Sequence, residues 1–420
     1  MAILRSSNPL VWFFDPIRPT GELAEERFRF SGSSMAWQIP LGIGIIALVA
    51  AFVTGSAGED LSQFYFSYLV AWAFAVSLAL GGLFFLLIQH LTKARWSVVF
   101  RRIPEALVWS FPVLALMGIP IVLGMHDLYH WTHADLLDPT SHHYDPVIAG
   151  KSGYLNTPFF LIRLAGYFLI WSVISYRLYT SSIRLDQTGD IAETRSMRVT
   201  SAWGLPLTAI SVSFASYDIL MSVDPHWFST MFGVYFFSGS FMAIMAFMIL
   251  MAMFFQRGGM LKEVTTEHYQ DLGKFMFGFV IFWAYIAFSQ YMLIWFGNLP
   301  EETVWYAHRM AHGWENHSAI LLVAHFILPF IILVGRWAKR LKPLLGFMAL
   351  WLLAMHWFDF HWLVMPVLHP DHAQITPSDI LALVGMSGIL VGMVVFRLSR
   401  HSMVPQKDSR LGHSLAFRNT

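Results

Sequence analysis

The sequence of 420 residues contains no cysteine. Without thiols the chain cannot form disulfides, hold zinc or iron–sulfur clusters through cysteine, or use a cysteine nucleophile. Charge is also scarce, because Asp, Glu, Lys and Arg make up 13% of the residues, against about 25% in an ordinary soluble protein. So few charges cannot cover a water-exposed surface, and the composition excludes a soluble globular enzyme.

Apolar residues are abundant instead: 56% of the chain is hydrophobic and 16% is aromatic. The net charge of +1 gives no basic field for nucleic acid. A hydrocarbon core about 30 Å thick requires roughly 20 apolar helical residues. The sequence therefore predicts an all-α polytopic membrane protein with ten transmembrane helices, at residues 35–58, 61–92, 106–126, 157–176, 199–217, 225–256, 275–300, 316–335, 343–366 and 380–396.

The basic residues lie on alternate loops of this arrangement. Twenty-four of the 27 Lys and Arg residues precede span one, follow span ten, or lie in the loops after spans two, four, six and eight. Because cytoplasmic loops carry an excess of Lys and Arg, both termini are predicted to be cytoplasmic. Residues 1–34 are expected to form an arm that binds a partner or is disordered. Residues 35–398 form the ten-helix domain, and a disordered tail is expected at 399–420.

Histidines are concentrated on the opposite side, where one long loop covers roughly residues 125–156. Twelve of the 18 histidines fall there: His126, His130, His133, His142, His143, His226, His308, His312, His317, His361, His369 and His372. Two pairs in this set have the i, i+4 spacing that binds a metal if the segment is helical. Neither pair has the glutamate of a metalloprotease motif. Hydrogen bonding to loops or contact with a partner is favoured, and no metal site is predicted.

A few ionisable residues lie within the predicted spans, where they are functional-site hypotheses by default. Counting along the helices at about 1.5 Å per residue places the main candidates in the outer half of the membrane. His356 and Asp359 share one helix face because they are three residues apart. The predicted proton-handling cluster is Asp218, His325, His356 and Asp359. The same layer holds Gln290, Tyr235 and Arg163, the last of which needs a carboxylate partner or a cavity.

The inner half of the membrane is poorer in such groups. His90 ends span two and Glu105 opens span three, so both are predicted near the cytoplasmic mouth. Together with the outer cluster, this distribution is typical of a proton relay. The alternative is that the polar groups only join helices by hydrogen bonds, which is favoured for the serines and threonines.

Other functions use the same residues. His325 and His356 could ligate a haem b as a membrane anchor, although a cytochrome b usually carries two histidines on each of two helices. A histidine and a carboxylate could hold a quinol head group and accept its protons. An autonomous transporter of a small solute would need broken helices, for which Pro112, Pro120 and Pro206 are candidates.

Three blocks of sequence resemble a known family: residues 214–240, residues 287–303 and residues 356–366. The first reads FASYDILMSVDPHWFSTMFGVYFFSGS, the second contains AFSQYMLIWF followed by LPEET, and the third reads HWFDFHWLVMP. They resemble the ActF-type membrane subunits of bacterial alternative complex III. These belong to the polysulfide-reductase-like (NrfD-type) integral membrane family. The resemblance extends over most of spans two to nine and is specific in the three blocks.

The resemblance implies two four-helix bundles, spans two to five and six to nine, flanked by spans one and ten. It also implies a respiratory or photosynthetic complex in the bacterial cytoplasmic (inner) membrane. The expected partners, besides membrane lipids, are a sister NrfD-type membrane subunit, an iron–sulfur subunit and multihaem cytochrome c subunits. Haem and iron–sulfur clusters then belong to partners, this chain has no covalent cofactor, and menaquinone or another quinol is its candidate ligand. Since the family generally places quinol oxidation in the sister subunit, proton translocation is expected here.

Overall fold

The structure, a computed structural model, describes residues 28–58 and 60–419, which form helices and turns without strands. Ten helical segments are long and apolar enough to cross a membrane, as the sequence predicts. They are Met35–Gly55 (α2), Ser62–Leu91 (α3), Arg102–Leu123 (α4–α6), Thr157–Thr188 (α9), Ile191–Val223 (α10 and a 3₁₀ turn), Phe232–Arg257 (α11), Thr266–Gly297 (α12), Trp314–Leu333 (α14, η6 and α15), Lys342–Leu368 (α17) and Pro377–Ser399 (α18). Residues 1–27 of the predicted arm lie outside the described residues.

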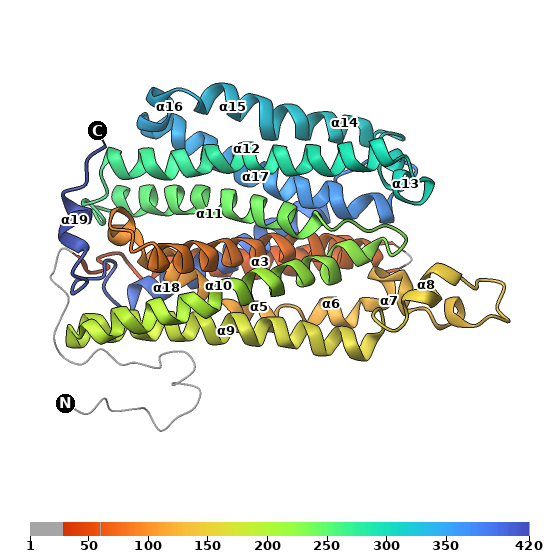
Figure 1. Cartoon of the computed structure of the whole chain (residues 1–420), viewed down its shortest axis with the longest axis horizontal. Helices are drawn as coiled ribbons and strands as arrows, with labels where there is room; N and C mark the ends of the chain where they lie inside the picture. The colour runs from red at the N-terminus through yellow and green to blue at the C-terminus, as the bar shows by residue number, and fades with distance from the viewer. Residues whose placement is uncertain (1–27, 59, 420) are drawn as a thin grey trace.

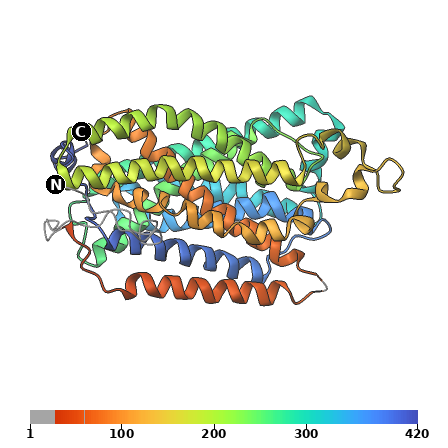
Figure 2. The ribbon, with the colours of Figure 1, turned by 90° about the horizontal axis from the view of Figure 1, so that it is seen from below.

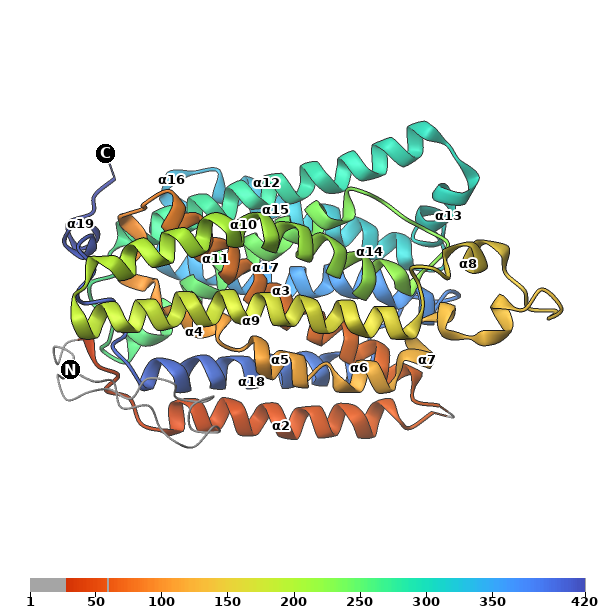
Figure 3. The same cartoon turned by 60° about the horizontal axis from the view of Figure 1, so that its bottom comes forward.

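Two helices occupy the centre of the bundle. Nearly every residue of α3 is buried, and most of α11 is buried against it. Helices α4, α9 and α10 are grouped around α3, whereas α12 and α17 pack on α11. Helix α2 lies along α18 at one side of the molecule, as Figures 2 and 3 show. Helix α18 also packs on α3 and α4, and α17 contacts α3 as well as α11.

The two ends of the bundle carry different short helices (Figure 1). One end, called here the basic end, carries the short helices Arg336–Arg340 (α16) and Leu411–Leu415 (α19). The other, the histidine-rich end, carries Met125–Leu128 (α7), Pro146–Lys151 (α8) and Pro300–His308 (α13). The described start of the chain and its C-terminal segment meet at the basic end, where the Met403 N–H donates to the Phe28 carbonyl at 2.9 Å.

The C-terminal segment is packed against the bundle, so the expectation of a disordered tail is wrong. Ser414 is fully buried, and its hydroxyl accepts a hydrogen bond from the Val99 N–H at 3.1 Å. The Ser414 carbonyl lies 3.0 Å from Nε2 of His268. Asp408 pairs with Arg101 at 2.7 Å. Single polar anchors of this kind leave no hydrophobic periodicity, and sequence patterning could not find them.

Prolines shape two of the spans. Pro112 and Pro120 stand in the first turns of Phe111–Leu116 (α5) and Ile119–Leu123 (α6), where a missing N–H is tolerated, and they divide span three into short helices. Pro206 lies inside α10 without ending it. Two of the three predicted kink positions therefore break the helix.

Span eight contains a π-helical segment, Leu321–Ile327 (η6), just before Pro329. The Leu328 N–H bonds to the carbonyl five residues back, at Val323. Pro329 has no N–H, so the Ala324 carbonyl has no helical donor in either register. The Trp351 indole N–H supplies the missing bond at 2.7 Å. This side chain of α17 thereby stabilises the widened turn that carries His325.

Helices α3 and α11 approach each other closely at Gly81. A Cβ built there would lie 2.2 Å from the backbone oxygen of Ser240, whereas a Cβ at Gly82 would meet only side chains at 3.4 Å or more. Gly81→Ala is therefore expected to destabilise the protein by about 1–3 kcal/mol through overpacking. Gly82→Ala is the matched control and should be neutral or slightly stabilising, because alanine favours helices. Thermal unfolding in detergent measures both variants, and equal midpoints would contradict the close approach.

Candidate functional site

A buried carboxylate lies at the centre of the second helix group. Asp359 on α17 is 1% exposed and accepts a hydrogen bond from the Trp283 indole at 3.0 Å and another, very short, from the Tyr235 hydroxyl. Trp283 lies on α12 and Tyr235 on α11. Among the described residues no lysine or arginine pairs with Asp359. The two neutral donors therefore offset part of the large free-energy cost of burying a carboxylate.

His325 completes one side of this site. Its ring stacks on Trp283 with a centroid separation of 3.9 Å and an interplanar angle of 27°. The side chain is fully buried, and neither ring nitrogen has a hydrogen-bond partner. Because buried polar atoms are nearly always bonded, two open nitrogens on one imidazole are unusual. The π-helical turn holds this ring beside the indole that bonds Asp359.

His356 lies one helical turn from Asp359 and completes the other side. Its Nε2 lies 2.9 Å from the Ser77 hydroxyl of α3, while its Nδ1 has no hydrogen-bond partner. The ring packs against α11 so closely that a Cβ at Gly239 would lie 2.7 Å from Cε1. We call Asp359, Tyr235, Trp283, His325 and His356 the Asp359 site. It combines a carboxylate with two imidazoles that have open nitrogens, the groups that accept and donate protons.

Asp218 is not part of this site, so the predicted cluster of four is wrong in one member. Both oxygens of Asp218 accept hydrogen bonds from the guanidinium of Arg163, at 2.8 and 3.0 Å. The Tyr167 hydroxyl adds a third bond at 2.7 Å. The guanidinium also lies over the Tyr154 ring, 3.9 Å from its centroid. The expectation that Arg163 needs a carboxylate is confirmed, and the pair joins α9 to α10.

Gln290 lies beyond the Asp359 site, toward the histidine-rich end. Its carbonyl oxygen accepts from the Ser229 hydroxyl at 2.9 Å, and its amide donates to the Tyr306 hydroxyl at 3.2 Å. These bonds connect α12 to a loop and to α13. Its partners make it a helix-to-loop connector, and no bond among the described residues joins it to Asp359.

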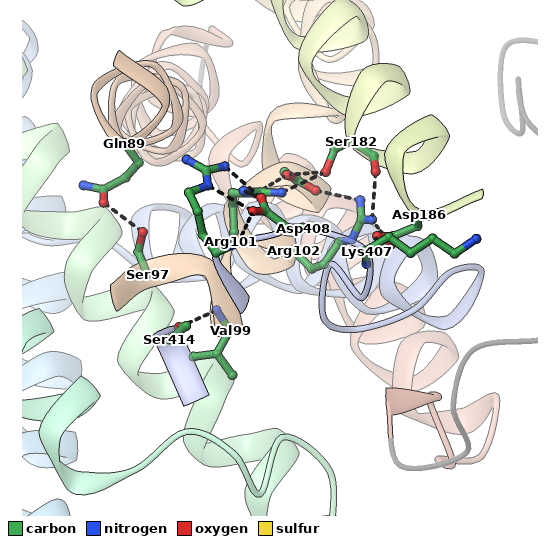
Figure 4. A network of polar contacts seen from close by, with 12 residues as sticks. Gln89, Ser97, Val99, Arg101, Arg102, Ser182, Asp186, Lys407, Asp408 and Ser414 are labelled. Atoms are coloured by element: carbon green, nitrogen blue, oxygen red, sulfur yellow. Dashed lines mark hydrogen bonds and ion pairs between the residues drawn. The ribbon is translucent and has the colours of Figure 1, made fainter. Parts of the chain in front are cut away.

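Figure 4 shows the polar network around Arg101, Arg102 and Asp408 at the basic end. Glu105 accepts from Arg101 at 2.9 Å, from Arg102 at 2.7 Å and from the Ser182 hydroxyl at 2.8 Å. A carboxylate held by two buried arginines is part of a structural ion-pair network. His90 lies nearby, 3% exposed, with no partner for its Nε2. Glu105 and His90 were both predicted near the cytoplasmic mouth, and of the two His90 has a ring nitrogen without a hydrogen-bond partner.

The same network predicts a pH dependence. Burial alone would raise the pKa of Asp408, but Arg101 and Arg410 overcome this and hold the pKa well below its usual value. A depressed pKa gives stability that is present above the unfolded pKa of about 3.9 and is lost as the pH falls through the folded value. Asp408→Asn should therefore lower the unfolding midpoint at pH 7, and this difference from wild type should shrink progressively as the pH falls below about 4. A difference that is independent of pH, measured by thermal unfolding, would contradict this assignment.

Sequence reasoning missed several residues around these sites. Trp283 and Ser77 gave no signal, because aromatic and small polar residues are too common in this chain to single out. At the histidine-rich end, Asp379 caps α18, accepts from the Ser67 hydroxyl at 2.6 Å and lies 3.6 Å from Nε2 of the buried His361. The spacing of Thr376 and Asp379 is that of a capping box and could have revealed it.

The two histidine pairs considered for metal binding are not helical pairs. Tyr129 is extended between His126 and His130, and His312 lies beyond the end of α13 in a left-handed conformation. Within residues 28–58 and 60–419 no group of three or more acidic or histidine side chains could hold a metal ion. Comparison of the sequence with known protein families and with curated proteins found no match.

Proposed function

We propose that this chain is an integral membrane subunit of a quinol-oxidising electron-transfer complex of the alternative complex III type, in which it provides part of a transmembrane proton path. The observation that carries the proposal is the Asp359 site, with a carboxylate and two imidazoles buried inside a bundle of ten membrane-length helices. Within the described part of the chain, no ion pair neutralises Asp359, His325 or His356. Ionisable groups are rarely kept inside a membrane without a role in transport or catalysis.

The chemistry of the site fits proton transfer. Asp359 can hold a proton or release it while Trp283 and Tyr235 keep its position through hydrogen bonds. His325 and His356 each have a nitrogen free to take or give a proton. A proton reaching Asp359 would pass between these groups by short rotations of side chains or through water.

The orientation follows from the distribution of charge. The excess of Lys and Arg assigns the basic end to the cytoplasm and the histidine-rich end to the outside. His90 is then the favoured group for proton uptake, with Glu105 as part of the framework around it. The Asp359 site would relay the proton onward, and His361 with Asp379 lies nearest the outer surface.

Packing weighs against the haem-binding alternative. Nε2 of His356 is bound to Ser77, and its open Nδ1 faces Gly239 so closely that a Cβ there would lie 2.9 Å from it. A haem ligand needs a free nitrogen and room for the macrocycle on one side of the ring. Experiment can distinguish the proposed function from a quinol site in this chain and from an autonomous transporter. The observation that favours the transporter is the division of span three into short helices.

Purification from the native membrane in mild detergent tests the assignment to a complex. The proposal expects the chain to copurify with multihaem cytochrome c, an iron–sulfur subunit and a sister membrane subunit. Isolation of the chain alone, with no haem in its absorption spectrum, would support the transporter. A reduced-minus-oxidised spectrum with haem b bands from the isolated chain would support the anchor.

A further inference from the structure

An exposed side of α12 carries a groove that no part of the proposed proton path uses. Its volume is about 640 Å³, within the range of about 300–1,000 Å³ typical of ligand sites. The lining residues are Phe237, Asp271, Lys274, Phe275, Gly278, Phe279 and Phe282. Six of the seven belong to α12 and recur three or four residues apart, so they form one stripe along the helix.

The stripe has a polar end and an apolar end. Asp271 and Lys274 lie near the start of α12 at the basic end, and phenylalanines line the rest. From residue 271 to residue 282 the helix rises about 16 Å, roughly half of a hydrocarbon core of about 30 Å. The groove therefore has the length and polarity of one leaflet, with its polar end at the membrane surface. Those are the dimensions of a single membrane lipid.

Gly278 opens the middle of the groove. A Cβ at this position would meet nothing within 4 Å, and the residue is exposed at the protein surface. Phe237 and Phe279 have their ring centroids 5.9 Å apart, at an interplanar angle of 84°. Phe275 stacks on Trp96 at 5.6 Å, which anchors the polar end of the groove to the loop before α4.

Lys274 is the group at the polar end that can hold an anionic head group, with Asp271 beside it in the lining. The Lys274 ammonium bonds to Asp271 at 2.8 Å and to the side chain of Asn419 at 2.9 Å, and the lysine side chain is half exposed. Trp96 and Asn419 contact the polar end of the groove, and each follows an arginine in the sequence, Arg95 and Arg418. Basic surfaces between membrane helices at the cytoplasmic side recognise anionic lipids.

We propose that this groove binds one anionic glycerophospholipid, with an acyl chain along the phenylalanines and the phosphate at Lys274. The proposal does not rest on the proton path or on the complex. Native mass spectrometry of the purified full chain, or of the complex in which it purifies, tests it with equal amounts of added dioleoylphosphatidylglycerol and dioleoylphosphatidylcholine. Wild type should retain phosphatidylglycerol over phosphatidylcholine by about fivefold.

Two variants and a matched control make the test specific. Gly278→Leu fills the groove and should abolish the retained lipid, while Gly166→Leu on α9, where a Cβ also meets nothing within 4 Å, should retain it. Lys274→Gln should keep an adduct but lose the preference for phosphatidylglycerol. Equal retention of both lipids by wild type, or the same adduct in Gly278→Leu and Gly166→Leu, would overturn the proposal. Loss of subunit assembly in Gly278→Leu, with no change in the lipid bound to the chain, would also overturn it.

Discussion

Replacing Asp359 by Asn is expected to slow proton release during turnover of the proposed electron-transfer complex by about a hundredfold, the lower end of the range for loss of a positioned proton-transfer group. Asparagine has nearly the same shape and can still accept a hydrogen bond from Trp283, but it cannot carry the exchangeable proton. The side chain is buried between α11, α12 and α17, so no other described carboxylate can replace it there. Proton release is measured with a pH indicator after a quinol pulse in proteoliposomes.

Asp218→Asn is the matched control for this prediction, since it makes the same chemical change at a second buried carboxylate. Asp218 is neutralised by Arg163, so its replacement should leave the ratio of protons to electrons unchanged in the assembled fraction. Gel filtration shows whether each variant is assembled. An Asp359→Asn complex that releases protons at the wild-type ratio, or an equal loss in Asp218→Asn, would remove Asp359 from the path.

The second large effect concerns stability. The side chains of Arg163 and Asp218 are 9% and 2% exposed and form a bidentate pair between α9 and α10. Arg163→Met leaves the Asp218 carboxylate buried without its cation, and breaking a buried pair in this way costs about 3–5 kcal/mol. The unfolding midpoint in detergent should fall accordingly.

A double variant separates the loss of the pair from the loss of packing. Arg163→Met combined with Asp218→Asn removes both charges, so it should be more stable than Arg163→Met alone. Thermal unfolding followed by gel filtration gives the midpoints of all three proteins. If the double variant is no more stable than Arg163→Met, the destabilisation comes from lost side-chain volume.

Hydropathy and charge were sufficient to predict the ten spans, because the thickness of the bilayer fixes the length of each helix. Depth could also be counted, and it placed His325, His356 and Asp359 at one level. The rotation of each helix about its axis could not be predicted, since nearly all faces of these helices are apolar. Asp218 therefore bonds to Arg163 on α9 and not to the Asp359 site.

Local backbone chemistry accounts for much of the rest. The π-helical turn at His325 follows from Pro329 together with a distant tryptophan, and no local pattern connects those residues. Arg309 follows α13 and is 1% exposed, and its Nε donates to the Trp362 carbonyl at 3.3 Å, a group freed by Pro366. Such contacts depend on the tertiary arrangement, which the sequence alone did not supply.

The central claim is that Asp359 changes its protonation state while the complex works. Infrared difference spectroscopy of the complex during quinol oxidation, compared between wild type and Asp359→Asn, measures this directly. A carboxylic acid C=O band that appears or disappears with turnover in wild type and is absent in Asp359→Asn is the predicted result. An identical set of carboxylic acid bands in the two proteins would contradict the account.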